Sequence, residues 1–413
     1  MLHPPAEKPG ELAYFITQKL TLPQGRGTGT REEAWAAGWL AELLSSWGLE
    51  VAQESFRALA DMNWLPLVAA GVCVLAYLLF PWRGWTRWLG GVLALCPPLL
   101  LWRALTRADS PLRALLPRVE SQSTIARLSP SGTPAVRLAV VAHLDSNRCR
   151  WHWRAGKGRA VRWGTWFTLA VYGAAAAGLW ASLASGDLVF YLAGLPGAGY
   201  AWLTLALLAA ELRQPYSPGA VDNASSVGVA CELARRALES SLPGVELWFC
   251  FTGAEETDHR GVKELLRRHR RLREAWFLVL EGVGAGELVW LSRQGVIPYR
   301  PHPELARLAE RVAEARPELR VQPAELLVVD ETQTLRRAGL PALTIAGLDP
   351  TTASLPGWHT PQDDLSLVSK GALARAVEFT WELLWELSRV AGSGGLRYAE
   401  LKLGRGGGRG TGS

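Results

Sequence analysis

The sequence predicts an α/β protein with a mostly parallel central sheet, helices on both faces of that sheet, and two inserted transmembrane helical hairpins. Two observations predict this fold class. From residue 215 onward, short apolar runs alternate with segments of helical period, which is typical of parallel sheets covered by helices. Upstream, four apolar spans of roughly 20 residues each come in two pairs, and that length matches the hydrocarbon core of a bilayer.

Composition narrows the functional class. Apolar residues make up 49% of the 413 residues and charged residues only 20%. This favours a protein with a membrane portion over a simple cytosolic enzyme, so a lipid bilayer is an expected partner. The net charge of +6 invites a nucleic-acid hypothesis. However, the arginines crowd beside the apolar spans, where basic residues set membrane topology, so we expect no nucleic-acid partner.

Residues 10–60 form the first part of the globular domain. A Gly-punctuated loop precedes an amphipathic pattern from about Arg31 to Trp47, which predicts a helix that ends at Gly48. A short strand is expected at Leu49–Phe56. Residues 120–148 then supply two strands around a Ser-Pro-Ser-Gly turn, and the second is a continuous apolar run, as in a strand buried on both faces.

The two hairpins are predicted at residues 64–102 and 163–210. Each consists of two apolar spans joined by a short turn, and the four spans are 64–82, 85–102, 163–185 and 188–210. Pro97-Pro98 predicts a kink or an incomplete span in the second of them. Tight hairpins place the rest of the chain on one side of the membrane.

Basic residues gather on that side. The opposite turns offer only Arg83 and Arg87, whereas the side of the globular domain carries Arg103, Arg107, Arg113, Arg118, Arg148, Arg150, Arg154, Lys157, Arg159 and Arg162. Because cytoplasmic flanks are enriched in Lys and Arg, the sequence predicts a multi-pass protein of the cell membrane with its globular domain in the cytoplasm.

Residues 215–390 form the main part of the domain. Helices are expected at about 225–238, 262–273, 303–315 and 369–390, and strands at 245–251, 276–281, near 326–329 and at 342–346. The Gly-rich end, residues 403–413, is predicted to be a flexible tail.

Candidate functional residues stand where predicted strands end. The apolar run VELWFCF leads into two adjacent carboxylates, Glu255 and Glu256. Where a strand ends and the backbone turns, one carboxylate can bind a metal while the next faces a substrate cleft. His143 ends another buried strand, and Asp145 two residues later can orient its ring.

Three further residues extend this set. Asp222 lies in a Pro-Gly-Ala-Val-Asp-Asn loop just before a predicted helix, where a carboxylate could bridge two metals. Glu281 ends the apolar strand AWFLVLE, an unfavourable place for a lone acid unless it is paired or binds a cation. His359 lies in a Pro- and Gly-flanked loop, and Asp363 is its expected orienting partner. Two imidazoles and three carboxylates suit two zinc ions.

The order HLD, GAVDN, EE, strand acid and HTPxD resembles the co-catalytic di-zinc aminopeptidase family, peptidase family M28, which also includes glutamate carboxypeptidase-like and glutaminyl cyclase-like members. The resemblance covers residues 10–60, 120–148 and 215–390. It implies a zinc-exopeptidase fold, two zinc ions per chain, a peptide substrate and, most simply, aminopeptidase activity.

The resemblance also implies a role for each residue. One zinc ion would take His143 and Glu281, the other Glu256 and His359, and Asp222 would bridge them. Glu255 would deprotonate the shared water and pass the proton to the leaving amine. Asp145 and Asp363 would orient the ligands.

The sequence departs from the family pattern in several places. Glu281 stands where the family usually has Asp, and Asp330-Glu331-Thr332 aligns with a usual Ser-Asp-His. His143 and Asp222 are 79 residues apart, where relatives have a short loop, and the second hairpin fills the gap. The active site is therefore expected to open near the bilayer surface, which favours hydrophobic peptides or membrane-protein termini as substrates.

Two alternative functions remain: a glutaminyl cyclase-like acyltransferase with a single zinc ion, and a catalytically silent membrane scaffold. Four other histidines stand in basic or helical contexts and are expected to be solvated surface residues: His152, His259, His269 and His302.

Overall fold

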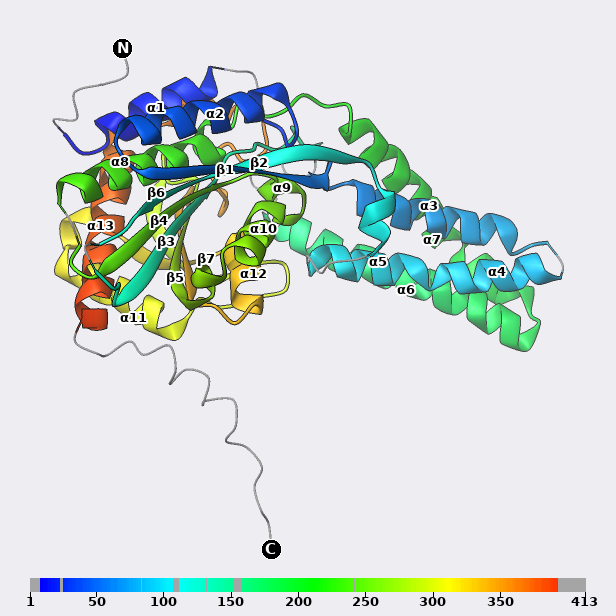
Figure 1. Cartoon of the computed structure of the whole chain (residues 1–413). Coiled ribbons are helices and arrows are strands. Elements are labelled where there is room, and N and C mark those ends of the chain that lie inside the picture. The colour runs from blue at the N-terminus through cyan, green and yellow to red at the C-terminus, as the bar shows by residue number, and fades with distance from the viewer. Residues whose placement is uncertain are drawn as a thin grey trace, which may run out of the picture.

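The structure, a computed structural model, describes residues 8–22, 25–82, 84–106, 111–130, 132–151, 158–240 and 242–392. His152 and the predicted tail at 403–413 lie outside these residues. Figure 1 shows a sheet domain from which a long helical arm projects at one end.

The sheet has eight strands in the order β1-β2-β4-β3-β5-β8-β6-β7. The strands are β1 (Glu50–Leu59), β2 (Arg118–Leu128), β3 (Val136–His143), β4 (Val245–Thr252), β5 (Ala275–Glu281), β6 (Glu287–Gln294), β7 (Gln322–Leu326) and β8 (Ala342–Leu348). The four central strands β4, β3, β5 and β8 run parallel. Antiparallel pairs join β1, β2 and β6 to the rest, while β7 runs parallel to β6. The predicted fold class is confirmed.

Helices cover both faces of this sheet. One apolar core joins the sheet to α1 (Glu11–Thr21), α2 (Arg31–Ser46), α8 (Ser226–Glu239), α11 (Pro303–Ala315) and α13 (Lys370–Gly392). A second core joins the other face to α10 (Arg260–Arg268) and α12 (Glu331–Arg337). Along β3, Val140 belongs to the first core and Val141 to the second, because successive side chains of a strand point to opposite faces. This explains why the strand is continuously apolar.

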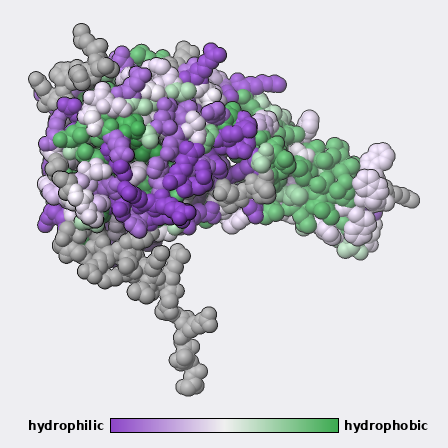
Figure 2. Space-filling view, viewed as in Figure 1, coloured by the Kyte–Doolittle hydropathy of each residue, from purple (hydrophilic) through white to green (hydrophobic). Residues whose placement is uncertain are grey.

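The arm contains α3 (Trp64–Leu79), α4 (Trp85–Ala94), α5 (Cys96–Leu105), α6 (Gly158–Ser185) and α7 (Leu188–Glu211). Its helices bury a separate core that includes Tyr77, Phe80 and Tyr172. The outside of the arm is also apolar, in contrast to the largely hydrophilic surface of the sheet domain (Figure 2). Trp163, Phe167, Trp202 and Leu203, among others, are exposed there.

Three helical stretches of the arm have the length and composition needed to cross a membrane, Trp85–Leu105, Ala160–Ser185 and Leu188–Glu211. The fourth predicted span, α3, is apolar but has only 16 residues. The break expected near Pro97-Pro98 divides α4 from α5 at Leu95, and the prolines occupy the first turn of α5, where a missing N–H does no harm.

Both hairpins are inserted at the same end of the strands, the one at which β1 and β3 finish. The antiparallel register of β1 and β2 ends at the pair Leu59↔Arg118, so helices α3–α5 replace the turn of a β-hairpin. Helices α6 and α7 follow β3 and lead back toward Asp222. Since β3 also finishes at this end, the carboxyl ends of the parallel strands face the base of the arm.

The sequence pattern missed α1, β6, the short helix α9 (Glu255–Asp258) and α12. It also placed a strand near residues 326–329, whereas β7 ends at Leu326.

Candidate metal centre

The predicted ligands converge at the carboxyl ends of the parallel strands, where ligand sites of open α/β sheets lie. His143 ends β3, Glu281 ends β5, and Glu255 and Glu256 open the short helix α9 (Glu255–Asp258) directly after β4. The turn at Ala220–Ser225 supplies Asp222. His359 comes from the loop after β8. All six side chains are buried.

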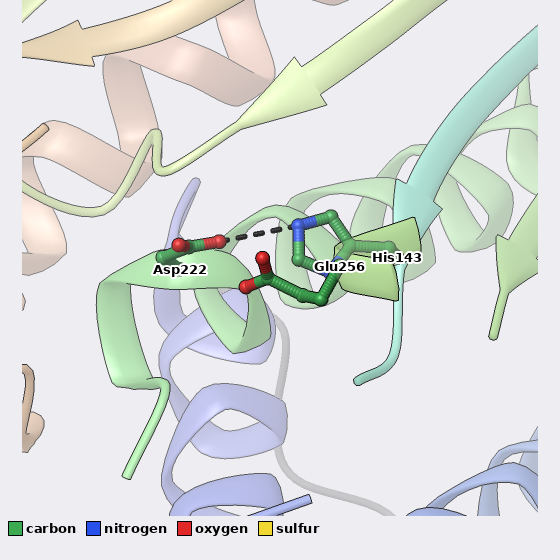
Figure 3. Close-up of side chains that lie close together, drawn as sticks. All are labelled: His143, Asp222 and Glu256. Carbon is green, nitrogen blue, oxygen red and sulfur yellow. Dashed lines mark ion pairs between the residues drawn. The ribbon is translucent and has the colours of Figure 1, made fainter. Parts of the chain in front are cut away.

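Asp222 lies between the two histidines. Its Oδ1 is 3.1 Å from Nε2 of His143, and its Oδ2 is 3.3 Å from Nε2 of His359. A second carboxylate faces each imidazole: Glu281 Oε1 is 3.5 Å from His143 Nε2, and Glu256 Oε1 is 3.2 Å from His359 Nε2. Figure 3 shows His143, Asp222 and Glu256 pointing toward one another from three separate segments.

These residues fit a cation. Ligand atoms of His143, Asp222 and Glu256 all lie within 4.8 Å of one another. His143 Nε2, Asp222 Oδ1 and Glu256 Oε1 are buried and have no hydrogen-bond partner among the described residues. Buried polar atoms are normally hydrogen-bonded, and three such atoms close together form a set of donors that could hold a metal ion. Glu281 is also within reach despite its extra methylene.

The charges of the cluster are mutually dependent. Burial tends to lower the pKa of both imidazoles, but the surrounding carboxylates outweigh burial. The pKa of His359 rises to about 9, mainly through Glu256 and Asp222, and the pKa of His143 rises well above its usual value through Glu281, Glu255 and Asp222. Burial would raise the pKa of Asp222, yet the two imidazoles lower it below its usual range. The site thus favours positive charge at its centre.

Asp145 acts differently from the prediction. The ring of His143 is oriented by the backbone carbonyl of Asp145, 2.9 Å from Nδ1, while the nearest carboxylate oxygen is 3.7 Å away. The carboxylate instead accepts hydrogen bonds from the backbone N–H groups of Glu255 (3.0 Å) and Glu256 (3.2 Å), and from Thr28 Oγ1 (2.8 Å). Asp145 follows the end of β3, and the turn that carries both glutamates begins beside it. The Asp145 carboxylate therefore holds that turn in place.

Asp363 also has a different partner from the one expected. Its carboxylate accepts hydrogen bonds from the backbone N–H groups of Val221 (2.6 Å) and Asp222 (3.3 Å). It therefore holds the Asp222 loop in place. The backbone carbonyl of His359, in turn, accepts a hydrogen bond from the N–H of Arg150 (3.0 Å).

Glu255 faces the centre of the cluster and a buried histidine. Its Oε2 is 3.9 Å from His143 Nε2, and its Oε1 is 3.2 Å from Nε2 of His259. Burial raises the pKa of Glu255 well above its usual value. The prediction that His259 is a solvated surface residue is wrong: the side chain is 0% exposed, and Nδ1 lies 3.0 Å from Thr334 Oγ1. The i,i+4 spacing from Glu255 was the available signal.

The other two described histidines are also not simple surface residues. His302 is buried and caps α11, accepting a hydrogen bond from the N–H of Glu304. His269 is half-buried and lies 2.9 Å from Glu54.

Sequence reasoning also missed a polar chain behind Glu256. Asn147 Nδ2 donates to Glu256 Oε2 (2.8 Å), and Asn147 Oδ1 accepts from Nη2 of Arg150 (2.9 Å). Arg150 Nη2 also donates to Asp61 Oδ1 (2.8 Å), just before α3. Arg148 donates to Asp61 Oδ2 (3.0 Å). No local pattern marks these residues, because Asn147 meets Glu256, and Arg150 meets Asp61, from distant segments.

Residues 208–384 match the family model of peptidase family M28. The resemblance to family M28 is confirmed. The match begins in the last turn of α7, so it includes Asp222, Glu255, Glu256, Glu281 and His359 but not His143. No match is found among curated proteins.

Solved structures of aminopeptidases and glutaminyl cyclases share the fold. A zinc aminopeptidase from Bacillus subtilis aligns with a TM-score of 0.55 at 14% identity, over 92% of this chain and 95% of that one. Glutaminyl cyclase from Porphyromonas gingivalis aligns with a TM-score of 0.55 at 15% identity, over 92% and 98%. An aminopeptidase from Aneurinibacillus sp. strain AM-1 gives 0.54 at 15%, over 91% and 93%. At such identity the likeness establishes the fold, which is common to both activities.

Proposed function

We propose that this chain is a membrane-anchored, zinc-dependent peptidase, in the first place an aminopeptidase, that hydrolyses peptide bonds with Glu255 as general base. One observation carries the proposal. The carboxylate of Asp222 is shared between His143 and His359, each histidine has a second carboxylate of its own, and Glu255 lies beside them. This is the arrangement of two half-sites around one bridging ligand.

Two zinc ions would fit these half-sites. His143 with Glu281 would hold one, Glu256 with His359 the other, and Asp222 both. When bound, such a metal pair would polarise a carbonyl group and lower the pKa of the attacking water molecule.

The chain's own residues then move the proton. The backbone N–H of Glu255 is fixed by Asp145 and its carboxylate by His259. Glu255 takes a proton from the attacking water and returns it to the amine as the C–N bond breaks, while the hydroxyl joins the acyl carbon. A carboxyl group whose pKa is raised by burial suits both steps.

We further propose that the arm anchors the domain in the cell membrane, with the sheet domain on the cytoplasmic side. The apolar exterior and the length of its helices support the anchor. The cytoplasmic side is supported by fewer basic residues than the sequence suggested. Of the ten that predicted this side, three are buried or partly buried in ion pairs of the sheet domain: Arg113 with Asp258, and Arg148 and Arg150 with Asp61. Substrates would be hydrophobic peptides or membrane-protein termini that reach the site at the bilayer surface.

The alternative is a glutaminyl cyclase-like acyltransferase with one zinc ion, since glutaminyl cyclases share the fold. Retention of both histidines around Asp222 favours the two-metal hydrolase.

Metal content per chain tests the proposal. We expect two zinc equivalents in detergent-purified protein dialysed free of loose ions, and fewer in His143→Ala, Asp222→Asn and His359→Ala. Asp364→Asn is the matched control, because Asp364 is close in sequence but bonds only Ser366 on the surface. Glu255→Gln should keep the metal and lose at least about 100-fold in peptide hydrolysis.

The other outcomes are equally informative. One equivalent would favour the cyclase-like alternative, to be tested with an N-terminal glutamine peptide. No metal in folded protein, together with a function unaffected by Glu255→Gln, would favour the silent scaffold.

A further inference from the structure

The candidate metal centre opens into a cavity of about 450 Å³ that continues into the arm. At one end the wall is formed by the centre itself, including Asp222, Glu255 and Glu281. At the other end it is formed by residues of α5, α6 and α7. We call this second part the lumen, and its wall includes Leu101, Leu105, Gly164, Thr168, Tyr200 and Thr204. The volume lies within the range of ordinary ligand pockets.

The lumen runs along two helices of the arm. Along α6 its wall runs from Ala160 to Thr168, and along α7 from Tyr200 to Leu208. Eight residues of α-helix rise by about 12 Å. An extended chain covers about 3.4 Å for every three chain atoms, so about ten atoms span the lumen. This length exceeds the reach of any natural apolar side chain.

The hydroxyl groups in the wall do not make the lumen polar. Thr165 and Thr204 donate to the carbonyls of Val161 and Tyr200, four residues earlier in their helices. Thr168 donates in the same way to Gly164 and contacts the Tyr200 hydroxyl at 2.6 Å. Because these hydroxyls already donate hydrogen bonds to backbone carbonyls of their own helices, they do not require a polar ligand. The lumen therefore suits an apolar chain.

The lumen ends inside the helical bundle. Its wall extends as far as the Thr168–Tyr200 contact, and the ring of Tyr200 packs against Tyr172, which is buried in the bundle core. Both walls belong to helices long and apolar enough to cross a membrane, Ala160–Ser185 and Leu188–Glu211. An apolar chain in the lumen would thus lie at the depth of lipid tails, with its polar end at the metal centre.

On the basis of the proposed hydrolase function, we propose that the lumen binds an apolar chain of about ten atoms that adjoins the scissile amide of a membrane-resident amphiphile. That chain is either a long apolar side chain or a fatty acyl group on the amide carbonyl. In both cases hydrolysis breaks the C–N bond, adds the water's hydroxyl to the acyl carbon and leaves the proton on the amine. The amide of such a substrate lies at the bilayer surface, whereas its apolar chain lies among the lipid tails.

Two substrate series test the lumen and distinguish its two occupants. One consists of the amides of alanine, norleucine and 2-aminodecanoic acid, and the other of acetyl-, hexanoyl- and decanoylglycine. Burial of one methylene changes an equilibrium constant by about fourfold. We therefore expect kcat/KM of the wild type to rise by up to about fourfold per added methylene in one series, until the chain reaches the Thr168–Tyr200 contact.

A matched pair of variants checks where the chain binds. A Cβ added at Gly164 or at Gly199 meets no atom within 4 Å, so neither Gly164→Leu nor Gly199→Leu brings a Cβ clash, and both raise helix propensity equally. Both glycines are exposed, but Gly164 lines the lumen, whereas Gly199 on α7 is not among the residues that line the cavity. Gly164→Leu should lose activity on the longest substrate by at least about tenfold and keep it on the shortest, while Gly199→Leu should match the wild type.

Three results would decide the matter. Cleavage that is independent of chain length, or equal behaviour of the two leucine variants, would overturn the lumen proposal and leave the hydrolase intact. No cleavage of any substrate by zinc-loaded protein would instead refute the proposed function. In that case the lumen can still be tested by calorimetry. The binding of 2-aminodecanoic acid amide and of decanoylglycine to the Glu255→Gln variant would be measured with and without Gly164→Leu.

Discussion

Arg150 Nη2 donates a hydrogen bond of 2.8 Å to Asp61 Oδ1, and the two side chains are only 2% and 4% exposed. Asp61 stands at the entrance to the arm, and Arg150 also holds Asn147, which donates to Glu256. Where α7 returns to the base of the arm, its last residue Glu211 accepts hydrogen bonds from the N–H of Trp151 and from Asn63. The base of the arm and the candidate metal centre therefore form one buried polar network.

Arg150→Met should destabilise the protein by about 3–5 kcal/mol, because it leaves Asp61 buried with only one of its two arginine partners. It should also lower metal occupancy, since Asn147 loses the group that orients it toward Glu256. Arg389→Met is the control: that exposed arginine pairs with Glu386 on α13, and such pairs contribute about 1 kcal/mol or less. Thermal unfolding and elemental analysis measure both effects. Equal melting temperatures for the two variants would show that the network does not couple the arm to the centre.

His259→Leu should lower kcat by about 10–100-fold, the usual effect of losing a partner that orients a catalytic group. The KM and the zinc content should change little, since His259 contacts Glu255 and not the ligand cluster. His302→Leu, another buried histidine but one that caps α11 away from the centre, should leave kcat unchanged. A fall in zinc content equal to the fall in kcat would instead assign His259 to metal binding.

Glu33 makes stability depend on pH. Its carboxylate accepts hydrogen bonds from Ser121 Oγ and the N–H of Gly29, but burial and the nearby Asp145 raise its pKa from 4.5 to about 8. Between these values the folded state holds a proton that the unfolded state has lost. The stabilisation is therefore complete below pH 4.5 and is lost as the pH rises through about 8, by up to about 1.4 kcal/mol per pH unit.

The variant Glu33→Gln should remove this slope. Thermal unfolding at several pH values between 5 and 9 should show the wild type losing stability relative to Glu33→Gln as the pH rises. Glu42→Gln, an exposed change on the same helix, should leave the pH dependence as in the wild type. A constant difference between wild type and Glu33→Gln would contradict the raised pKa.

The topology predicts which segments face the cytoplasm. A tag inserted after Gly186, in the turn between α6 and α7, should be reached by antibody on intact cells. A tag at the C-terminus should be reached only after the cells are permeabilised, because the sheet domain is proposed to be cytoplasmic. The opposite labelling would reverse the proposed orientation, and labelling of both tags on one side would exclude a spanning hairpin.

The sequence predicted the buried strands well and the irregular elements poorly. Strands β3, β4, β5 and β8 are continuous apolar runs because both of their faces are covered. Strand β6, ELVWLSRQ, mixes apolar and charged residues because it approaches the edge of the sheet, and α12 has only seven residues. Neither length nor periodicity distinguishes such segments from loops.

The candidate site shows the same division. Ligand types are restricted by chemistry, so residue type and position, at strand ends or in Pro- and Gly-containing loops, were enough to choose His143, Asp222, Glu256, Glu281 and His359. The supporting contacts depend on which distant segments meet. The carboxylate of Asp145 bonds Glu255, 110 residues away, and no spacing rule covers that distance.

The placement of α6 and α7 between His143 and Asp222 also orders the events of biosynthesis. His143 leaves the ribosome first, and Asp222 can approach it only after both helices of the hairpin have been made and accommodated. On the proposed topology, the nascent chain holds just one imidazole of the centre throughout this interval and has no hydrolytic activity. Activity then begins only in protein that has already reached its membrane, which protects the cytoplasm from a peptidase still in transit.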